Sequence, residues 1–152
     1  MHVSMLELAR SGRFGRIEIG AARRQLLEVL PPPSSWSAGS AWELAEIWKY
    51  GQIELHFAKD RLWMVFSDSH GLSDGSPSLE MDAWVLRRGL PRTLLEDALR
   101  EEQIDYSLSQ PAYDKRQCVL STEAGVRFTF METRDDPQDE LGLVAWDLQG
   151  ER

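Results

Sequence analysis

Alternating apolar and polar residues predict a set of strands. Residues 52–57 alternate with period two, which is typical of a strand with one buried face, whereas residues 62–66 are apolar on both parities and favour a central strand. We expect Gln52–Phe57 to pair antiparallel with Leu62–Ser67, and Val126–Phe130 with Leu141–Trp146. The last two segments belong to predicted strands with the full bounds Val126–Glu132 and Leu141–Leu148. Further predicted strands are Leu79–Val85, Tyr106–Ser109 and Gln117–Thr122, with Trp48 and Tyr50 in another.

Leucines at helical spacing predict two main helices, Ala21–Leu30 and Pro91–Gln103. Three consecutive prolines, beginning at Pro31, end the first helix, and Pro91 suits the first turn of the second. The expected apolar faces are Ala22, Leu26, Leu27 and Leu30 in the first helix, and Leu90, Leu94, Leu95, Ala98 and Leu99 in the second. Few helices without strict strand–helix alternation predict an α+β domain with an antiparallel sheet.

The two halves of the chain repeat one pattern. Ile53–Phe57 aligns with Val126–Phe130, and a glycine precedes each segment. Each hairpin follows one of the predicted helices. In the second strand of each hairpin, the aligned residues are, in order, Leu62, Met64, Val65 and Asp68 with Leu141, Leu143, Val144 and Asp147. In the helices, Leu26, Leu27 and Leu30 align in order with Leu94, Leu95 and Ala98. This pattern predicts pseudo-repeats over about 14–88 and 89–149 of a single domain, 1–152, with both helices on one face of the sheet and the other face open.

A family resemblance follows from these segments. Gly20–Leu30, closed by Pro33, resembles the opening of small outer-membrane assembly lipoproteins, and Trp48–Phe57 looks like their first two strands. A tandem copy of that unit is the architecture of the β-lactamase inhibitory protein family, whose concave sheet grips an enzyme. Ile47–Phe57 is also similar to uncharacterised bacterial proteins with a Trp-x-Tyr-Gly-x-Ile-Glu signature. No lipobox cysteine is present, so the resemblance implies this fold and protein binding, and no membrane role.

Composition narrows the function classes. The chain has 152 residues and a formal net charge of −8, which disfavours nucleic acid as a partner. A single cysteine, Cys118, excludes an intramolecular disulfide and a cysteine zinc cluster. The N-terminus lacks the apolar region of a signal peptide, and no apolar run approaches a membrane span. We therefore expect a cytoplasmic protein with no membrane partner.

No motif in the chain predicts catalysis, a metal or a cofactor. Residues 71–75 match the G-x-S-x-G nucleophile elbow, but an alternating strand follows where a helix is required, so we interpret them as a turn. Asp68, His70 and Asp74 offer potential metal ligands, yet solvated loop residues explain them better. Glu54 and His56 share the polar face of one strand, which allows proton transfer or an ordinary cross-strand pair. We expect no enzyme activity.

Aromatic and acidic residues instead predict a protein interface. The chain has six tryptophans, and exposed tryptophan and tyrosine dominate protein interfaces. Residues 77–152 hold 16 of the 25 acidic side chains, and several of these are concentrated in the loop between the last two predicted strands. They are either ordinary solvent-exposed loop residues or a charged surface that attracts a basic partner. The predicted binding residues are Trp48, Tyr50, Trp63, Trp84, Asp135, Asp136, Asp139 and Glu140.

Three functions follow from these observations. The first is a non-enzymatic protein-binding module, of the immunity or inhibitory type, that caps a bacterial toxin or enzyme. The second is a small-ligand binder or hydrolytic enzyme that uses Glu54, His56, Asp68 and His70. The third is a housekeeping protein of another kind. A deep pocket that unites those four side chains would favour the second, and a broad aromatic-lined sheet would favour the first.

Overall fold

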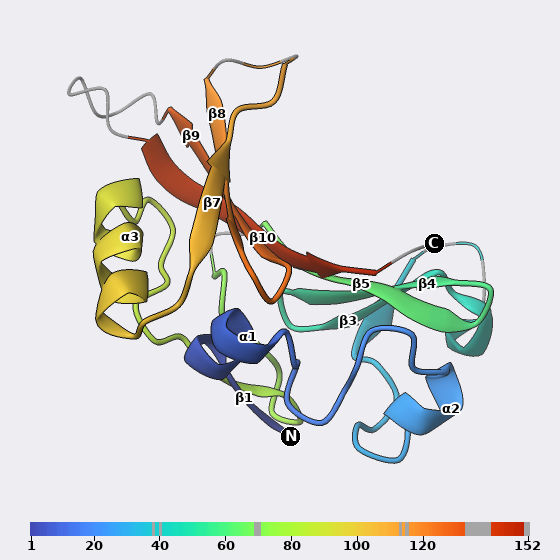
Figure 1. Ribbon diagram of the computed structural model, residues 1–152. Helices are drawn as coiled ribbons and strands as arrows, with labels where there is room; N and C mark the ends of the chain where they lie inside the picture. Colours follow the sequence, from blue (N-terminus) through green and yellow to red (C-terminus); the bar gives the residue numbers. More distant parts are fainter. Residues whose placement is uncertain are drawn as a thin grey trace.

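The fold is built on one eight-stranded antiparallel sheet. The computed structural model describes residues 1–37, 39, 41–68, 71–112, 114, 116–132 and 141–150. The strands lie in the order β2-β3-β4-β5-β10-β9-β8-β7 (Figure 1). Their bounds are β2 Ser35–Trp36, β3 Ile47–Tyr50, β4 Ile53–Ala58, β5 Arg61–Ser67, β7 Tyr106–Ser109, β8 Gln117–Thr122, β9 Val126–Glu132 and β10 Leu141–Gln149. The predicted α+β class with an antiparallel sheet is confirmed, as are the two predicted strand pairings, β4 with β5 and β9 with β10.

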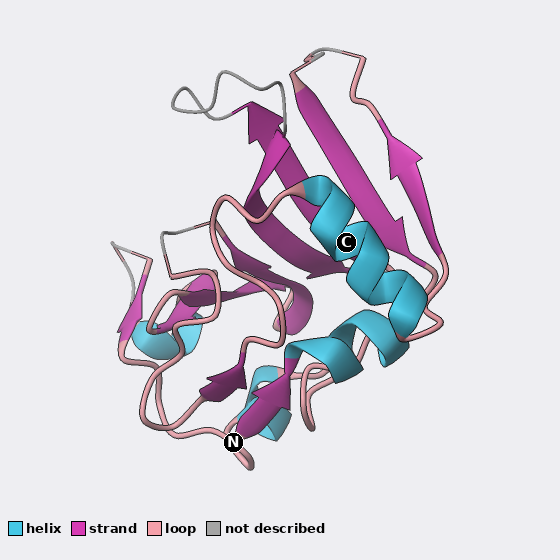
Figure 2. Ribbon diagram, turned by 90° about the vertical axis from the view of Figure 1, so that its left-hand side faces the viewer, coloured by secondary structure: helices cyan, strands magenta, loops and turns pink. Residues whose placement is uncertain are grey.

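Short helices and a second, small sheet lie on one side of the large sheet (Figures 1 and 2). The small sheet is a parallel pair, β1 (His2–Ser4) with β6 (Glu80–Asp82). The helices are α1 (Met5–Ser11), α2 (Arg23–Leu26) and α3 (Arg92–Glu101), with a 3₁₀ turn η1 at Trp42–Leu44. Among the described residues, no helix is long and apolar enough to cross a membrane.

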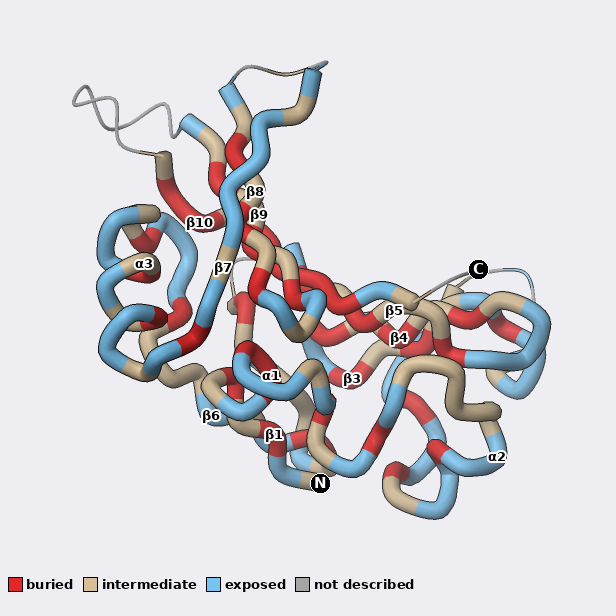
Figure 3. The backbone as a smooth tube through the Cα atoms, in the orientation of Figure 1, coloured by how far each residue is buried: buried red, intermediate tan, exposed pale blue. Residues whose placement is uncertain are grey.

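The two faces of the large sheet differ in burial. Residues alternate between buried and half-buried along β4, β8 and β9, as Figure 3 shows by colour. The buried parity packs toward the helices and includes Ile53, Leu55, Leu120, Phe128 and Phe130. The other parity is half-buried, and no helix of the described chain covers it. We call this second side the open face.

The two halves of the sheet have the same connectivity. The chain runs from α2 through β2, β3 and β4 to β5, and from α3 through β7, β8 and β9 to β10. β5 and β10 are neighbours in the middle of the sheet, so β2 and β7 form its opposite edges. The residue before each helix forms a β-bridge with the last strand of the same half, Ala22 with Arg61 and Pro91 with Gly142.

Each half also has a β-bulge at the same place in its hairpin. In the first hairpin Phe57 pairs with Leu62 and His56 with Met64, which leaves Trp63 as the extra residue. In the second, Phe130 pairs with Leu143 and Thr129 with Ala145, which leaves Val144. A bulge shifts the parity of the residues beyond it.

The helices differ in extent and phase from their predictions. The predicted helix Ala21–Leu30 is α-helical only at Arg23–Leu26 and continues as turns to Leu30, where the following prolines, which offer no N–H group, end it. Pro91–Gln103 is helical from Arg92 to Glu101. Leu27 and Leu94 remain 40% and 47% exposed, so their predicted core positions are wrong.

The predicted strand Leu79–Val85 is shorter and belongs elsewhere. Only Glu80–Asp82 is extended, and it pairs with β1 outside the large sheet. Trp84, two residues after the strand, has a φ of 52°, which is outside the extended region. The preceding 71–75 loop leads into this strand without a helix, so it lacks the geometry of a nucleophile elbow. The carbonyl of Leu72 in this loop accepts a hydrogen bond from the Trp146 indole at 2.8 Å.

Candidate functional site

One row of side chains crosses the whole open face. Because directly opposite residues share a face, the strand registers align the eight positions of this row. From one edge to the other they are Ser35, Lys49, Glu54, Phe66, Asp147, Arg127, Ser121 and Ser107. Phe66 lies at the centre, an acidic residue flanks it on each side, and a basic residue lies beyond each acid.

Glu54 is the hub of the polar network in the first half. Lys49 donates a hydrogen bond to its Oε1, and the His56 Nε2 lies 2.9 Å from its Oε2. Glu54 and His56 are 19% and 16% exposed, so the contact between them is shielded from water, whereas Lys49 is 41% exposed. Burial opposes ionisation, but the bonds from Lys49 and His56 hold the pKa of the Glu54 carboxyl below its usual value. At neutral pH this group therefore accepts hydrogen bonds as a carboxylate and does not donate a proton.

An ion pair lies in the second half of the row. The Arg127 Nε donates to Asp147 Oδ1 at 2.8 Å. The Asp147 side chain is 8% exposed and Arg127 is 42% exposed, so the guanidinium shields the carboxylate from water. Both carboxylates of the row thus have their charge balanced within the protein, which reduces the cost of covering this face.

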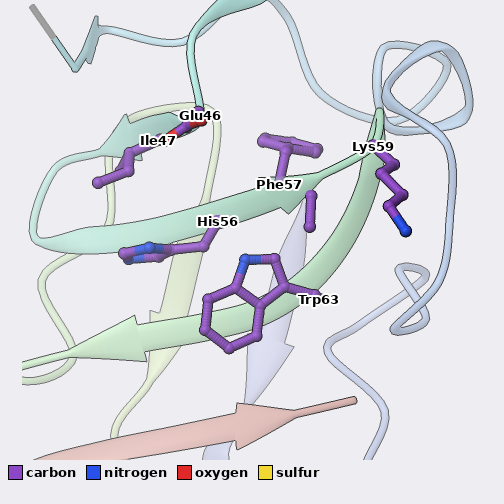
Figure 4. Close-up of a pocket in the computed structure, with 7 residues that line it drawn as sticks. Glu46, Ile47, His56, Phe57, Lys59 and Trp63 are labelled. Atoms are coloured by element: carbon purple, nitrogen blue, oxygen red, sulfur yellow. The ribbon is translucent and has the colours of Figure 1, made fainter. Parts of the chain in front are cut away.

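An aromatic cluster lies beside the first network. The rings of Trp63 and Phe66 each meet the His56 ring edge-on, with centroids 6.1 Å away. His56 and Trp63 also line a shallow cleft of about 400 Å³ at the end of the first hairpin, shown in Figure 4. The other lining residues are Glu46, Ile47, Phe57, Ala58 and Lys59. Trp63 and Lys59 both line this cleft, and its size suits one side chain inserted by a bound partner.

The predicted aromatic binding residues occupy different environments. Trp48 and Tyr50 are fully buried on the helix side of β3, so neither is available to a partner on the open face. The Tyr50 hydroxyl donates to the Pro31 carbonyl at 2.7 Å, and burial raises its pKa to about 12. Trp84 is half-buried after β6, outside the strands of the large sheet, and packs against the hydrophobic core. Of the four, only Trp63 lies on the open face.

The other predicted residues are not assembled into one site. Asp135, Asp136, Asp139, Glu140 and His70 lie outside the described residues. In the part of the chain that is described, no hydrogen bond or ion pair joins Asp68 to Glu54 or His56, and no group of three acidic, histidine or cysteine side chains could hold a metal ion. Cys118 is buried in β8.

Sequence reasoning missed Phe66, Arg127 and the role of Lys49 in the row. The sequence alignment of the two hairpins could have indicated Arg127. Glu54 and Arg127 occupy the same polar position in the two aligned strands, and each lies opposite the second strand of its hairpin. Phe66 gave no such signal, because the bulge at Trp63 places it on the open face.

Comparisons of this chain with protein-family models, curated protein sequences and solved structures return no match. The resemblance to assembly lipoproteins and tandem inhibitors therefore remains a prediction from the sequence.

Proposed function

We propose that this chain is a non-enzymatic binding module of the immunity or inhibitory type, acting in the cytoplasm, that holds another protein against its open face. The observation that carries this proposal is the row across the open face, with Phe66 at its centre and its carboxylates already paired. An apolar centre with balanced ionic groups around it is the arrangement that protein interfaces favour.

The location of the aromatic cluster supports the same function. Trp63 and Phe66 are half-buried, held edge-on by His56, and project from β5, one of the two middle strands of a broad sheet. Rings that are fixed before binding lose little conformational entropy when a partner covers them. The acidic surplus of the chain, net −8, would raise the association rate of a basic partner.

We also propose that the two halves are tandem copies of one helix-plus-sheet unit. The supporting observations are the matching bridges, the matching bulges and a repeated pair of hydrogen bonds. Leu62 N–H donates to the carbonyl of Ala21 and Leu143 N–H to that of Leu90, both at 2.9 Å. An arginine, Arg23 or Arg92, directly follows each bridging residue.

These contacts shift part of the sequence alignment. The contacts match Leu62 with Leu143, whereas the sequence pattern aligns Leu62 with Leu141. They match Leu26 with Leu95, whereas the sequence pattern aligns Leu26 with Leu94. The alignment of Ile53–Phe57 with Val126–Phe130 is unchanged. With this register, the open face has a pseudo-twofold axis between β5 and β10.

A small-ligand site in the same place is the second candidate. The Glu54–His56 hydrogen bond and the cleft beside Trp63 favour it. The cleft is shallow and Glu54 is already engaged by Lys49, so it has no free acid–base pair. This candidate predicts a rise in melting temperature with a small molecule, abolished by His56→Ala.

Binding kinetics of a captured partner test the proposal. The protein is used to isolate partners from its native cell, each partner is purified, and the dissociation constant is measured for wild type, Trp63→Ala and Phe66→Ala. Each substitution should speed dissociation and weaken binding at least tenfold, as for anchor residues at an interface centre.

Trp36→Ala is the matched control, because Trp36 is 42% exposed but shares the helix side with Trp48. It should leave the affinity nearly unchanged. Equal effects of all three substitutions, or an effect of Trp36→Ala alone, would show that the partner binds elsewhere. High salt should slow association and leave dissociation unaffected.

A further inference from the structure

β7 is a four-residue edge strand that lacks charge, proline and a bulge as protection against pairing. Ser107, Leu108 and Ser109 are exposed, and Leu108 is 45% exposed. Edge strands are commonly blunted by charges, proline, a bulge or short length. β7 contains neither charge nor proline, and its register with β8 is regular. The opposite edge, β2, is only two residues long.

The backbone of Leu108 faces away from β8. The Glu123 N–H donates to the Asp105 carbonyl at 3.1 Å, so Asp105 and Glu123 form a hydrogen-bonded pair. Every second pair of an antiparallel ladder is hydrogen-bonded, so the pairs of Ser107 and Ser109 with β8 are of this kind. The N–H and C=O of Leu108, between them, therefore point outward from the sheet edge.

We propose that β7 pairs antiparallel with β7 of a second copy of this chain, with Leu108 on the twofold axis. Opposite residues must share a face, so a strand that pairs with its own copy joins residues of equal parity. Leu108 opposite Leu108 satisfies this condition and unites the outward backbone groups in one hydrogen-bonded pair. Ser107 then lies opposite Ser109 of the second copy.

The chemistry of β7 fits a second copy. On the helix side, two exposed leucines cover each other, and on the open-face side hydroxyls meet hydroxyls. A charged residue near the axis would face its own copy and repel it, and β7 has none. One short strand gives a small interface, so the dimer is weak and depends on concentration.

Pairing at this edge would join two large sheets into one. The twofold axis is perpendicular to the sheet, so both open faces lie on the same side of the dimer. A dimer of this kind presents two copies of the row that contains Phe66 to the same partner surface. The inference rests on β7 alone and is independent of what the open face binds.

Sedimentation equilibrium over a range of concentrations, up to about 1 mM, tests the pairing. Wild type should approach the mass of a dimer. Leu108→Lys and Leu108→Glu should each weaken dimerisation at least tenfold, because like charges face each other on the axis. An equimolar mixture of these two variants should associate at least as tightly as wild type. Leu94→Lys is the control, since Leu94 on α3 is similarly exposed at 47% and should have no effect.

Cross-linking tests the register. Non-hydrogen-bonded antiparallel neighbours lie about 4.5 Å apart at Cα, within disulfide range. A mixture of Ser107→Cys and Ser109→Cys should form a mixed disulfide dimer faster than either variant alone. The native Cys118 is buried, and wild type gives the background rate. A wild-type chain that stays monomeric at about 1 mM, or a Lys/Glu mixture that does not associate, overturns the proposal.

Discussion

Replacing Arg23 with alanine removes the side chain that fixes α2 to the first hairpin. Its guanidinium carbon lies 4.2 Å from the centre of the Phe57 ring and 5.5 Å from that of Trp48. Its Nη1 donates to the Ala45 carbonyl, and its Nε pairs with Asp60 at 2.9 Å. The side chain is 12% exposed, and burial lowers its pKa while Asp60 acts in the opposite direction.

The cost of the substitution can be built from these contacts. A partly desolvated cation–π contact contributes about 0.5–2 kcal/mol, and a hydrogen bond from a charged donor about 1.5–3 kcal/mol. Asp60 is 68% exposed, so its ion pair adds only about 0.2–1 kcal/mol. Because neighbouring contacts are not additive, we expect Arg23→Ala to cost about 3 kcal/mol. Lysine keeps the charge without the planar fork and should cost about 1–2 kcal/mol.

Urea unfolding followed by tryptophan fluorescence measures these differences. Arg24→Ala is the matched control, because Arg24 lies in the same helix but is exposed, and it should change stability by less than about 0.5 kcal/mol. Equal effects of Arg23→Ala and Arg24→Ala would refute the assignment of Arg23 as the anchor of α2. A stable variant whose cleft residues shift in NMR spectra would show that the anchor also positions the β4–β5 turn.

Three further perturbations have defined outcomes. Leu95→Ala should cost about 2–5 kcal/mol in chemical unfolding, because Leu95 is fully buried, whereas Leu94→Ala, at an exposed site, should cost far less. Tyr50 has a folded-state pKa of about 12 against an ordinary 10.0, so wild type should lose about 2–3 kcal/mol of stability between pH 10 and 12 that Tyr50→Phe does not lose. The folded-state pKa of Glu54 is lowered, so its contribution is present at neutral pH and lost as the pH falls below about 4.5; Glu54→Gln should flatten acid unfolding curves in this range.

Strand positions were predictable wherever one face is buried. The bounds of β8 and β9 match the prediction, because alternating apolar residues must all face the same core, and those of β7 match although none of its residues is buried. β1 and β6 pair over only three residues, too few for a period to appear, so their parallel sheet was not predicted. Leu94 and Leu95 are adjacent leucines, and spacing alone does not decide which of them faces the sheet.

The burial of Trp48 and Tyr50 was within reach of the sequence, whereas the exposure of Phe66 was not. Gly51 and Gln52 form a two-residue hairpin turn, which places Tyr50 opposite Ile53 and Trp48 opposite Leu55. Opposite residues share a face, so both aromatic side chains must join the buried parity of β4. Phe66 has the parity of Leu62, and only the bulge at Trp63 moves it to the open face. Since a bulge depends on pairing with a neighbouring strand, local sequence does not reveal it. The centre of the open face is thus set by strand pairing, and the aromatic content of the sequence alone does not locate it.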